Sequence, residues 1–235
     1  MDKIKKLAKK HKLLIIEDGA EAHGAVYKNK KIGSIGDVTI FSFFANKNIT
    51  SGEGGMLVTN NKKIYELAAN VRNQSFSNKR HFWHKHIGFN YRMTNLQAAI
   101  GLAQTENLEK LVNKRINNAK IYNHYLKDIQ GISLPPSTKN IKNVYWMYTI
   151  VIDEDFGMSA IKLRYFLAKY GIETRSFFIP LHLQPIYFKR TYKNQFPVSE
   201  KIFKKNFYLP SSSHLTKKDI LYIVSKIKEA KELQN

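Results

Sequence analysis

The feature that most constrains the fold is an apolar strand that leads into a glycine-rich turn, with one lysine between them. Residues Val38 to Phe44 are mostly β-branched or aromatic, which is typical of a buried strand. Gly52, Gly54 and Gly55 follow, and glycine permits backbone angles and close approaches that a Cβ resists. The pattern therefore predicts either that Lys47 is held in place for covalent chemistry or that it is a surface lysine in a glycine loop.

The first half of the chain alternates apolar strands with helical segments, which indicates an α/β layer structure with a largely parallel sheet. Strands are expected at Leu13–Ile16, Val38–Phe44 and Met56–Thr59, and helices at Lys3–Lys12 and Lys62–Arg72. The opening helix has no preceding strand to pack beside. An N-terminal part of the sheet is therefore expected to be missing.

The second half indicates a smaller α+β domain. Apolar residues keep helical spacing from Asn95 to about Leu126, which predicts one long helix, straight or kinked. It ends before Gly131 and the pair Pro135–Pro136, so we expect a large domain over residues 1–130 and a small domain over 131–235. The small domain is expected to contain strands at Val144–Ile152 and Ile172–Phe178, a helix at Ser159–Tyr170, and a last helix from a capping box at Thr216–Asp219 to about Leu233.

The strong positive charge raises the question of a nucleic-acid partner. The chain has 235 residues and a formal net charge of +21, from 39 basic and 18 acidic residues. The lysines are scattered instead of forming one dense block, and no zinc-finger spacing, RNP-type motif or basic zipper is present. A substrate that carries phosphate uses the same charge equally well, so nucleic acid is the weaker reading.

Other classes of site and location follow from what the sequence lacks. It has no cysteine, which excludes disulfides, thiolate metal sites and a cysteine nucleophile. No apolar run approaches the length that crosses a bilayer, and the lysine-rich N-terminus lacks the pattern of a signal peptide. We therefore expect a cytoplasmic protein with no membrane span and no metal.

Two carboxylates follow the first expected strand. Glu17 and Asp18 lie at the end where ligands of open α/β sheets usually bind. A carboxylate beside a ring nitrogen keeps that nitrogen protonated, as a pyridine cofactor that acts as an electron sink requires. The dipeptide alone fits a solvated acidic loop as well.

Several separated motifs together resemble one family. IIEDGAEAHG, GSIGDVTIFSFFANKNITSGEGGMLVTN and IGFNYRMTNLQAAIGLAQ are similar, in this order, to signatures of the nucleotide-sugar aminotransferases of the DegT/DnrJ/EryC1/StrS type. GIETRSFFIPLHLQPIY and LPSSSHLT are similar as well. The resemblance is closest to perosamine-synthase-like 4-aminotransferases. It implies the type I, aspartate-aminotransferase-like α/β fold and the cofactor pyridoxal 5'-phosphate, with this chain forming the C-terminal part of the large domain plus the smaller α+β domain.

The resemblance also implies a reaction. Relatives transfer an amino group from glutamate to a nucleotide-linked 4-keto-6-deoxy sugar, as in the synthesis of amino sugars for O-antigen and other polysaccharides. By the same resemblance Lys47 is the catalytic residue that binds the cofactor covalently, and Asp18 pairs with its ring nitrogen. Glu21 stands where many relatives have glutamine, near the ring or its 3-hydroxyl, and Ser42 donates to the phosphate. A related dehydratase has histidine in place of the lysine, so Lys47 favours the aminotransferases.

Residues further along the chain are expected to bind the cofactor and the substrate. Asn90 matches a position that in relatives reaches the neighbouring subunit's cofactor phosphate, which implies a homodimer with a shared active site. Arg92, Arg175 and His182 are expected to bind the sugar nucleotide, although an exposed arginine at the start of a helix is the plainer interpretation of Arg92.

Some residues keep two interpretations at this stage. His23 is either a functional group over the cofactor ring or a histidine satisfied in the core. Tyr148 and Tyr187 are aromatic candidates for the substrate pocket, though core positions fit them better. The segment His81 to His86 has no ligand-spaced carboxylates or cysteines, so we expect an interface or substrate loop there and no metal.

The chain departs from the family pattern at its beginning, because it starts where relatives are already well into the large domain. The expected causes are a truncated or split gene, an expressed fragment, or a missing part that another chain supplies. Low or no activity is expected of the chain alone. The alternative to a working enzyme is a non-catalytic fragment or the assembly partner of a split aminotransferase.

Overall fold

The computed structural model describes residues 1–235 except 78, 81, 190–194 and 235. Contacts divide the chain into two compact units, one of residues 1–113 and 138–146 and the other of residues 114–137 and 147–235. Helix α4 (Leu108–Leu126) contributes to both units. The expected domain border at residue 130 stays a prediction.

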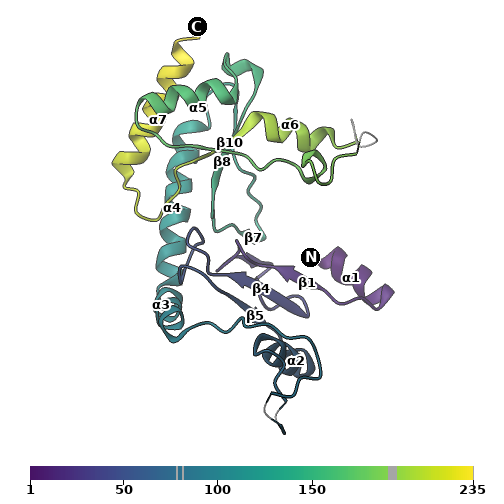
Figure 1. The fold of residues 1–235 in the computed structure, drawn as a ribbon. Coiled ribbons are helices and arrows are strands. Elements are labelled where there is room, and N and C mark those ends of the chain that lie inside the picture. Colours follow the sequence, from purple (N-terminus) through teal and green to yellow (C-terminus); the bar gives the residue numbers. More distant parts are fainter. Residues whose placement is uncertain (78, 81, 190–194, 235) are drawn as a thin grey trace. The chain divides into compact units, whose positions relative to one another are not determined.

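The first unit is built on a three-stranded sheet (Figure 1). Its strands are, in spatial order, β1 (Ile16–Asp18), β4 (Val38–Ser42) and β5 (Gly55–Val58). β1 and β4 are parallel, with Ile16 opposite Val38 and Asp18 opposite Ile40, whereas β5 is antiparallel to β4. The carboxyl ends of β1 and β4 therefore lie at the same edge of the sheet.

β1 lies later in the chain than the sequence pattern predicted. The strand was expected at Leu13–Ile16, yet pairing begins only at Ile16, because its partner strand starts at Val38. The preceding helix ends at Lys12 in a left-handed conformation with φ 53°, and Leu13 and Leu14 connect it to the strand as exposed residues. As a result Asp18 is the last residue of a strand and not the first residue of a loop.

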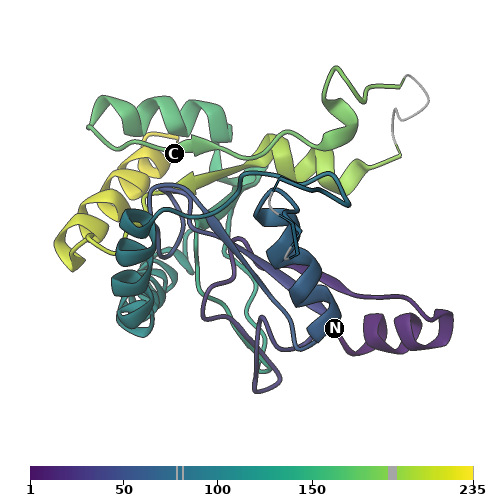
Figure 2. The ribbon, with the colours of Figure 1, turned by 60° about the horizontal axis from the view of Figure 1, so that its bottom comes forward.

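The remaining elements of the first unit are helices and one small antiparallel sheet. They are α1 (Asp2–His11), α2 (Lys62–Arg72), α3 (Asn95–Glu106), and the sheet β3 (Lys30–Lys31), β2 (Val26–Tyr27) and β7 (Ile141–Lys142). Figure 2 shows α1 as the outermost helix of this unit, and Ala8 is its only buried residue. The expected long helix is two helices, because the Asn107 side chain donates to the Ala103 carbonyl at 2.9 Å and interrupts the ladder between α3 and α4.

The second unit contains a four-stranded antiparallel sheet covered by helices. Its strands are β6 (Ile132–Ser133), β8 (Tyr148–Ile152), β10 (Asn206–Leu209) and β9 (Arg175–Ser176), in this spatial order, and its other elements are α5 (Ala160–Lys169), α6 (Pro197–Lys205), α7 (Lys217–Glu232) and the short helices η1 (Glu154–Phe156) and η2 (Leu181–Leu183). α5 packs against both α7 and β10 (Figure 1). Fully buried side chains from β8, α5 and α7 form the core between them: Ile150, Leu163, Leu167, Ile220 and Ile227.

Sequence patterns predicted the helices of this unit better than its strands. The capping box before α7 is confirmed, since Thr216 Oγ1 accepts from the Asp219 backbone and Asp219 Oδ2 accepts from the Thr216 backbone. α6 and β10 were not predicted. Every residue of β10 is buried, and a buried run of four shows neither helical nor alternating periodicity. Tyr148 is a core residue, as expected, with its ring stacked on Tyr122 at 4.6 Å.

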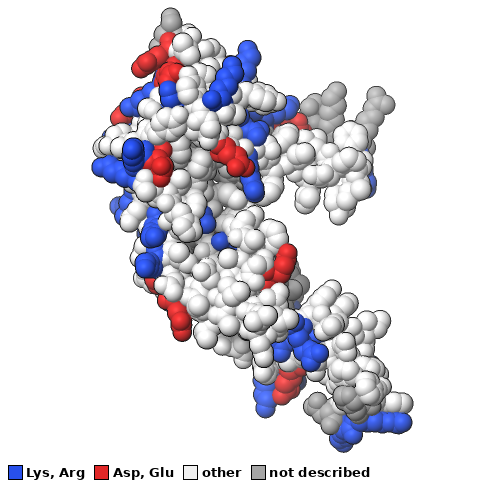
Figure 3. Space-filling view, turned by 60° about the vertical axis from the view of Figure 1, so that its left-hand side comes forward, with Lys and Arg blue, Asp and Glu red and all other residues white. Residues whose placement is uncertain are grey.

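Charged side chains do not gather into one dense patch on the face drawn in Figure 3. On the face in Figure 3, lysines and arginines are dispersed among neutral and acidic side chains. Within the described part of the chain, no helix is both long enough and apolar enough to span a bilayer.

Two glycines of the second unit allow a matched test of backbone strain. Gly131 has φ +83°, and an added Cβ would lie 2.1 Å from the Phe156 nitrogen, whereas Gly171 has φ +72° with no atom within 4 Å of that Cβ position. We expect Gly171→Ala to lower the free energy of unfolding by about 1–2 kcal/mol through φ alone. Gly131→Ala should lower it by at least a further ~2 kcal/mol, because backbone must also move. Urea unfolding followed by circular dichroism measures both, and equal losses would contradict the predicted clash.

Candidate active site

Lys47 lies in the turn that follows β4 and is held by contacts within the first unit. Its backbone N–H donates to the Phe44 carbonyl at 3.0 Å, and its side chain is 12% exposed. Nζ donates to Glu21 Oε1 at 3.3 Å and lies 4.3 Å from the centre of the Trp146 ring. The lysine is therefore enclosed and paired, which decides against the exposed lysine that the sequence left open.

Asp18 and Ser42 lie at the same edge of the sheet, at the ends of β1 and β4. Asp18 is opposite Ile40, two residues before Ser42, so alternation along a strand places Asp18, Ile40 and Ser42 on one face. Asp18 is exposed, and its Oδ1 accepts from the Ala20 backbone at 3.1 Å. Ser42 Oγ accepts from the Phe44 N–H at 3.2 Å, which fixes the hydroxyl and leaves its hydrogen as a donor.

His23 lies against the opposite face of β4, beside Phe41 and Phe43. Its ring centre is 5.1 Å from that of Phe41 and 5.8 Å from that of Phe43, and the residue is 4% exposed. Burial, and then the charge of Lys47, lower the pKa of His23 from 6.5 to about 4. The imidazole is therefore neutral at physiological pH.

Two buried polar side chains near Lys47 have no hydrogen-bond partner among the described residues. They are His23, with both ring nitrogens, and Asn48, with both amide atoms. Buried polar atoms are nearly always paired in folded proteins, and each unpaired group costs about 1–3 kcal/mol. Their presence is expected of a site that receives a polar group from outside the chain. It also disfavours the interpretation of His23 as a satisfied core residue.

Glu17, the other carboxylate of the motif, has a structural role. It is 8% exposed, and its Oε1 accepts from the Ile35 backbone at 3.2 Å and from Thr39 Oγ1 at 3.1 Å. These bonds hold the turn before β4 against β1. The neighbouring carboxylates are thus divided between structure, at Glu17, and the candidate site, at Asp18.

Asn90 and Arg92 are both exposed in the segment that leads to α3. Asn90 forms an isolated bridge with Asn73, and the Tyr91 N–H donates to the Arg72 carbonyl at 3.1 Å, so the segment runs beside the end of α2. Among the described residues, no hydrogen bond or ion pair joins either side chain to Lys47, whose ionic partner is Glu21. Their assignments to a neighbouring subunit's cofactor and to the substrate remain predictions.

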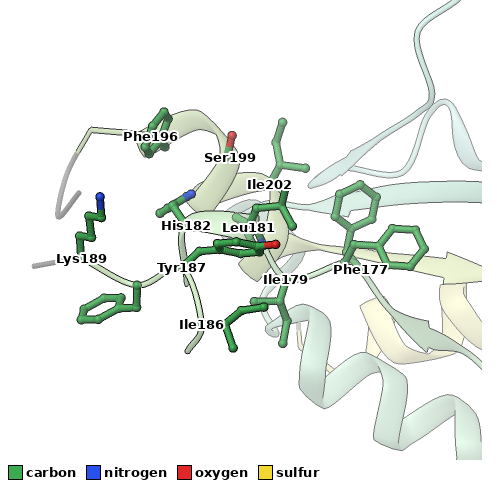
Figure 4. A pocket seen from close by; sticks show the side chains of 13 residues that line it. Phe177, Ile179, Leu181, His182, Ile186, Tyr187, Lys189, Phe196, Ser199 and Ile202 are labelled. Carbon is green, nitrogen blue, oxygen red and sulfur yellow. The ribbon is translucent and has the colours of Figure 1, made fainter. Parts of the chain in front are cut away.

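Arg175 and His182 belong to the second unit, so their positions relative to Lys47 remain a prediction. Arg175 is exposed on β9, opposite Tyr208. His182 and Tyr187 line an apolar hollow of about 950 Å³ (Figure 4). His182 Nε2 lies 3.2 Å from Glu200 Oε1, which orients the imidazole inside that hollow.

No metal centre is found among the residues that the structure describes, since no three His, Cys, Asp or Glu side chains there are grouped to hold an ion. His81 lies outside the described residues. Within the same loop, His84 Nδ1 lies 2.7 Å from the Gln74 carbonyl.

Comparison with known proteins decides the family. The family model described as the DegT/DnrJ/EryC1/StrS aminotransferase family matches residues 1–228. The chain belongs to this family. It is 39% identical over 229 residues to the GDP-perosamine synthase of Escherichia coli O157:H7, with 97% of this chain and 61% of that protein covered. It is 38% identical to the GDP-perosamine synthase of Caulobacter vibrioides, with 96% of this chain and 61% of that protein covered. The chain thus spans about three fifths of the length of these relatives.

Solved structures confirm the fold class expected for this aminotransferase family. DesV of Streptomyces venezuelae superposes with a TM-score of 0.90 at 30% identity, over 99% of this chain and 62% of that one. Helicobacter pylori PseC, an aminotransferase involved in the biosynthesis of pseudoaminic acid, superposes with a TM-score of 0.91 at 28% identity. The match covers 99% of this chain and 63% of that one. Family members use pyridoxal phosphate.

The described residues fit that cofactor. An enclosed amine at Lys47, an exposed carboxylate at Asp18 and a hydroxyl donor at Ser42 are the groups that an aldehyde, a pyridine nitrogen and a phosphate require. The unpaired buried atoms of His23 and Asn48 lie close by in the sequence. Trp146 was missed by sequence reasoning, because nothing in its neighbourhood marks it as a contact of a turn 100 positions away.

The neutral state of His23 predicts a specific loss of stability in acid. Between pH 6.5 and about 4 the unfolded chain takes up a proton at His23 that the folded chain does not, so stability falls as the pH falls through that window. This difference in pKa contributes about 3 kcal/mol to the free energy of unfolding above pH 6.5, and the contribution is lost as the pH falls to about 4. Urea unfolding at pH 7 and pH 4.5 should therefore show a larger loss for the wild type than for His23→Gln, whose side chain does not titrate. An equal loss in both proteins would show that His23 is not held neutral.

Proposed function

We propose that this chain carries the catalytic lysine of a pyridoxal-phosphate-dependent aminotransferase. Its reaction transfers an amino group from glutamate to a nucleotide-linked 4-keto-6-deoxy sugar, the chemistry of perosamine and viosamine synthesis. The arrangement at Lys47 supports this most directly, since an enclosed amine paired with Glu21 follows the strand that ends at Ser42. Similarity to two GDP-perosamine synthases favours amination at C4 of a GDP-linked sugar.

Each residue has a separate task in this proposal. Pyridoxal phosphate, when bound, supplies the carbonyl carbon that carries the amino group and a ring that takes up electrons. Lys47 binds it through Nζ, and the same amine, once released, moves a proton at the reacting carbon. Asp18 keeps the ring nitrogen protonated, and Ser42 donates to the phosphate. Glu21 lies at Nζ of Lys47 and so acts on the lysine as its counter-charge.

The remaining assignments concern the assembly and the substrate. Asn90 is proposed to reach the cofactor phosphate of a second subunit in a homodimer, and Arg92, Arg175 and His182 are proposed to bind the sugar nucleotide. The exposed position of Arg92 and Arg175 suits contacts to phosphates, whereas His182 lies among apolar side chains that suit the methyl group and C–H faces of a 6-deoxy sugar. The protein is proposed to act in the cytoplasm.

An alternative is that the chain is one component of a split aminotransferase. β1 has no strand on its outer side among the described residues, and the face it shares with β4 exposes Ile16 by 71% and Ile40 by 41%. An unpaired strand edge pairs readily with further polypeptide, and an exposed apolar face can pack against it. Under this alternative the chain binds cofactor at Lys47 without turning over sugar nucleotide until another chain covers that edge.

The decisive experiment mixes the purified chain with pyridoxal phosphate and records the visible absorbance of lysine-bound cofactor. Lys47→Ala should abolish this band, whereas Lys142→Ala should keep it, because Lys142 is also paired with a glutamate, at 3.0 Å, but lies outside the candidate site. Turnover is measured as the amino sugar nucleotide formed from glutamate and a GDP-linked 4-keto-6-deoxy sugar. Lys47→Ala should lower it by about 10²- to 10⁴-fold.

The outcomes separate the readings. A band that depends on Lys47, together with turnover, supports the enzyme. The same band without turnover favours the split component. A band that survives in Lys47→Ala contradicts both.

A further inference from the structure

Trp146 contacts two consecutive residues of the turn that carries the catalytic lysine. Its indole Nε1–H donates to the Asn46 carbonyl at 2.8 Å, and its ring centre lies 4.3 Å from Nζ of Lys47. The residue is 8% exposed, so both contacts lie out of water. A cation over an aromatic face within about 6 Å is attracted by the ring quadrupole, most strongly for tryptophan and when water is excluded.

The hydrogen bond makes this contact directional. A lysine side chain has four rotatable carbons and a charge without preferred geometry, so one ion pair leaves it considerable freedom. Glu21 is the charged partner of Lys47, and its side chain is 49% exposed. The ring is tied to the backbone one residue before Lys47, so its face stays at a set position relative to the root of that side chain.

The residue before Trp146 has an unusual backbone conformation, which sets the direction in which the indole projects. Tyr145 has φ +47°, in the left-handed region that a residue with a side chain rarely adopts, and its N–H donates to Asn143 Oδ1 at 2.9 Å. Strained conformations of this kind persist where surrounding structure imposes them, and they cluster at functional sites. The turn from Asn143 to Tyr145 thus delivers the indole to Lys47 from β7, a strand of the same unit.

We propose that Trp146 is a positioning residue for Lys47. The indole face holds Nζ in the orientation from which it meets the cofactor carbonyl, and it receives the amine again after release. This inference rests on the proposed function, because it assigns to Trp146 a role in the capture of pyridoxal phosphate. A tryptophan that merely fills the core would affect stability but not the rate at which Lys47 reacts.

The test follows covalent capture of pyridoxal phosphate at Lys47 in the chain without cofactor. Samples are quenched with borohydride at successive times, and the modified lysine is identified by mass spectrometry. Trp146→Leu removes both the ring face and the N–H, and it should slow capture about tenfold, because Nζ then samples orientations from which it cannot meet the carbonyl. Trp146→Phe keeps a weaker ring face without the N–H, so its rate should lie between those of Trp146→Leu and the wild type.

Tyr170 provides a matched control in the second unit. Lys226 Nζ lies 4.1 Å from its ring centre, and its hydroxyl donates to Glu229 Oε1 at 2.6 Å, so it also combines a cation over a ring with an anchoring hydrogen bond. Tyr170→Leu should leave the capture rate at Lys47 unchanged. A loss equal to that of Trp146→Leu would show that capture reports general stability, and it would overturn the inference.

A second readout needs no cofactor. The chain has two tryptophans, so Trp83→Phe leaves Trp146 as the sole tryptophan fluorophore. Adding Lys47→Met, which keeps most of the side chain's length and removes its charge, should shift the emission of Trp146, because an ammonium 4.3 Å from the ring perturbs the excited indole. Unchanged emission would show that the contact is absent, which overturns the inference.

The capture experiment also separates this inference from the proposed function. If the wild type captures cofactor at Lys47 and both Trp146 variants capture it at the same rate, only the positioning role fails. If the wild type captures none, the proposed function fails and the inference fails with it. Trp146→Phe protects the result against misfolding of the leucine variant, because it retains most of the buried volume.

Discussion

The parallel pairing of β1 with β4 is the constraint on which the candidate site depends. Ile16 opposite Val38 sets a register in which Asp18 lies opposite Ile40, two residues before β4 ends at Ser42. Asp18 is then the last residue of one strand, and Ser42 ends the other, at one edge of the sheet. A shift by one residue would turn every side chain of β1 to the other face and remove Asp18 from the face of Ser42. Glu17, bonded to the turn before β4, secures this register from the buried side.

Alternation along β4 gives its two faces different tasks. Ile40 and Ser42 share a face with Asp18, and that face remains partly open to solvent. Phe41 and Phe43 point to the other side, where their rings enclose His23. β4 and the residue that follows it thus supply the Ser42 hydroxyl on one face and the apolar rings of Phe41 and Phe43 on the other.

The candidate residues of the site could be named from the sequence, while its long-range contacts could not. The contiguous strand, lysine and glycines marked Lys47, and a carboxylate at a strand end marked Asp18, but each kept a plainer reading until the family resemblance was added. Trp146 lies 100 positions from Asn46, and no periodicity connects them. β10 escaped prediction for a related reason, because its residues are buried by partners on both sides and show no alternation. The break at Asn107 depends on one side-chain bond, which helical spacing alone does not reveal.

The neighbours of Lys47 suit the role proposed for it, in which its amine is bound, released and bound again. A buried, fully enclosed ion pair would resist release, because breaking it leaves one charge unpaired in a medium of low dielectric constant. The Glu21 side chain is half exposed, so water can solvate its carboxylate when the lysine moves away. Trp146 attracts the ammonium without a charge of its own. His23 adds no second cation, because burial and then the charge of Lys47 lower its pKa to about 4. The amine is therefore held by contacts of moderate strength, and no partner is left with an unpaired buried charge when it moves.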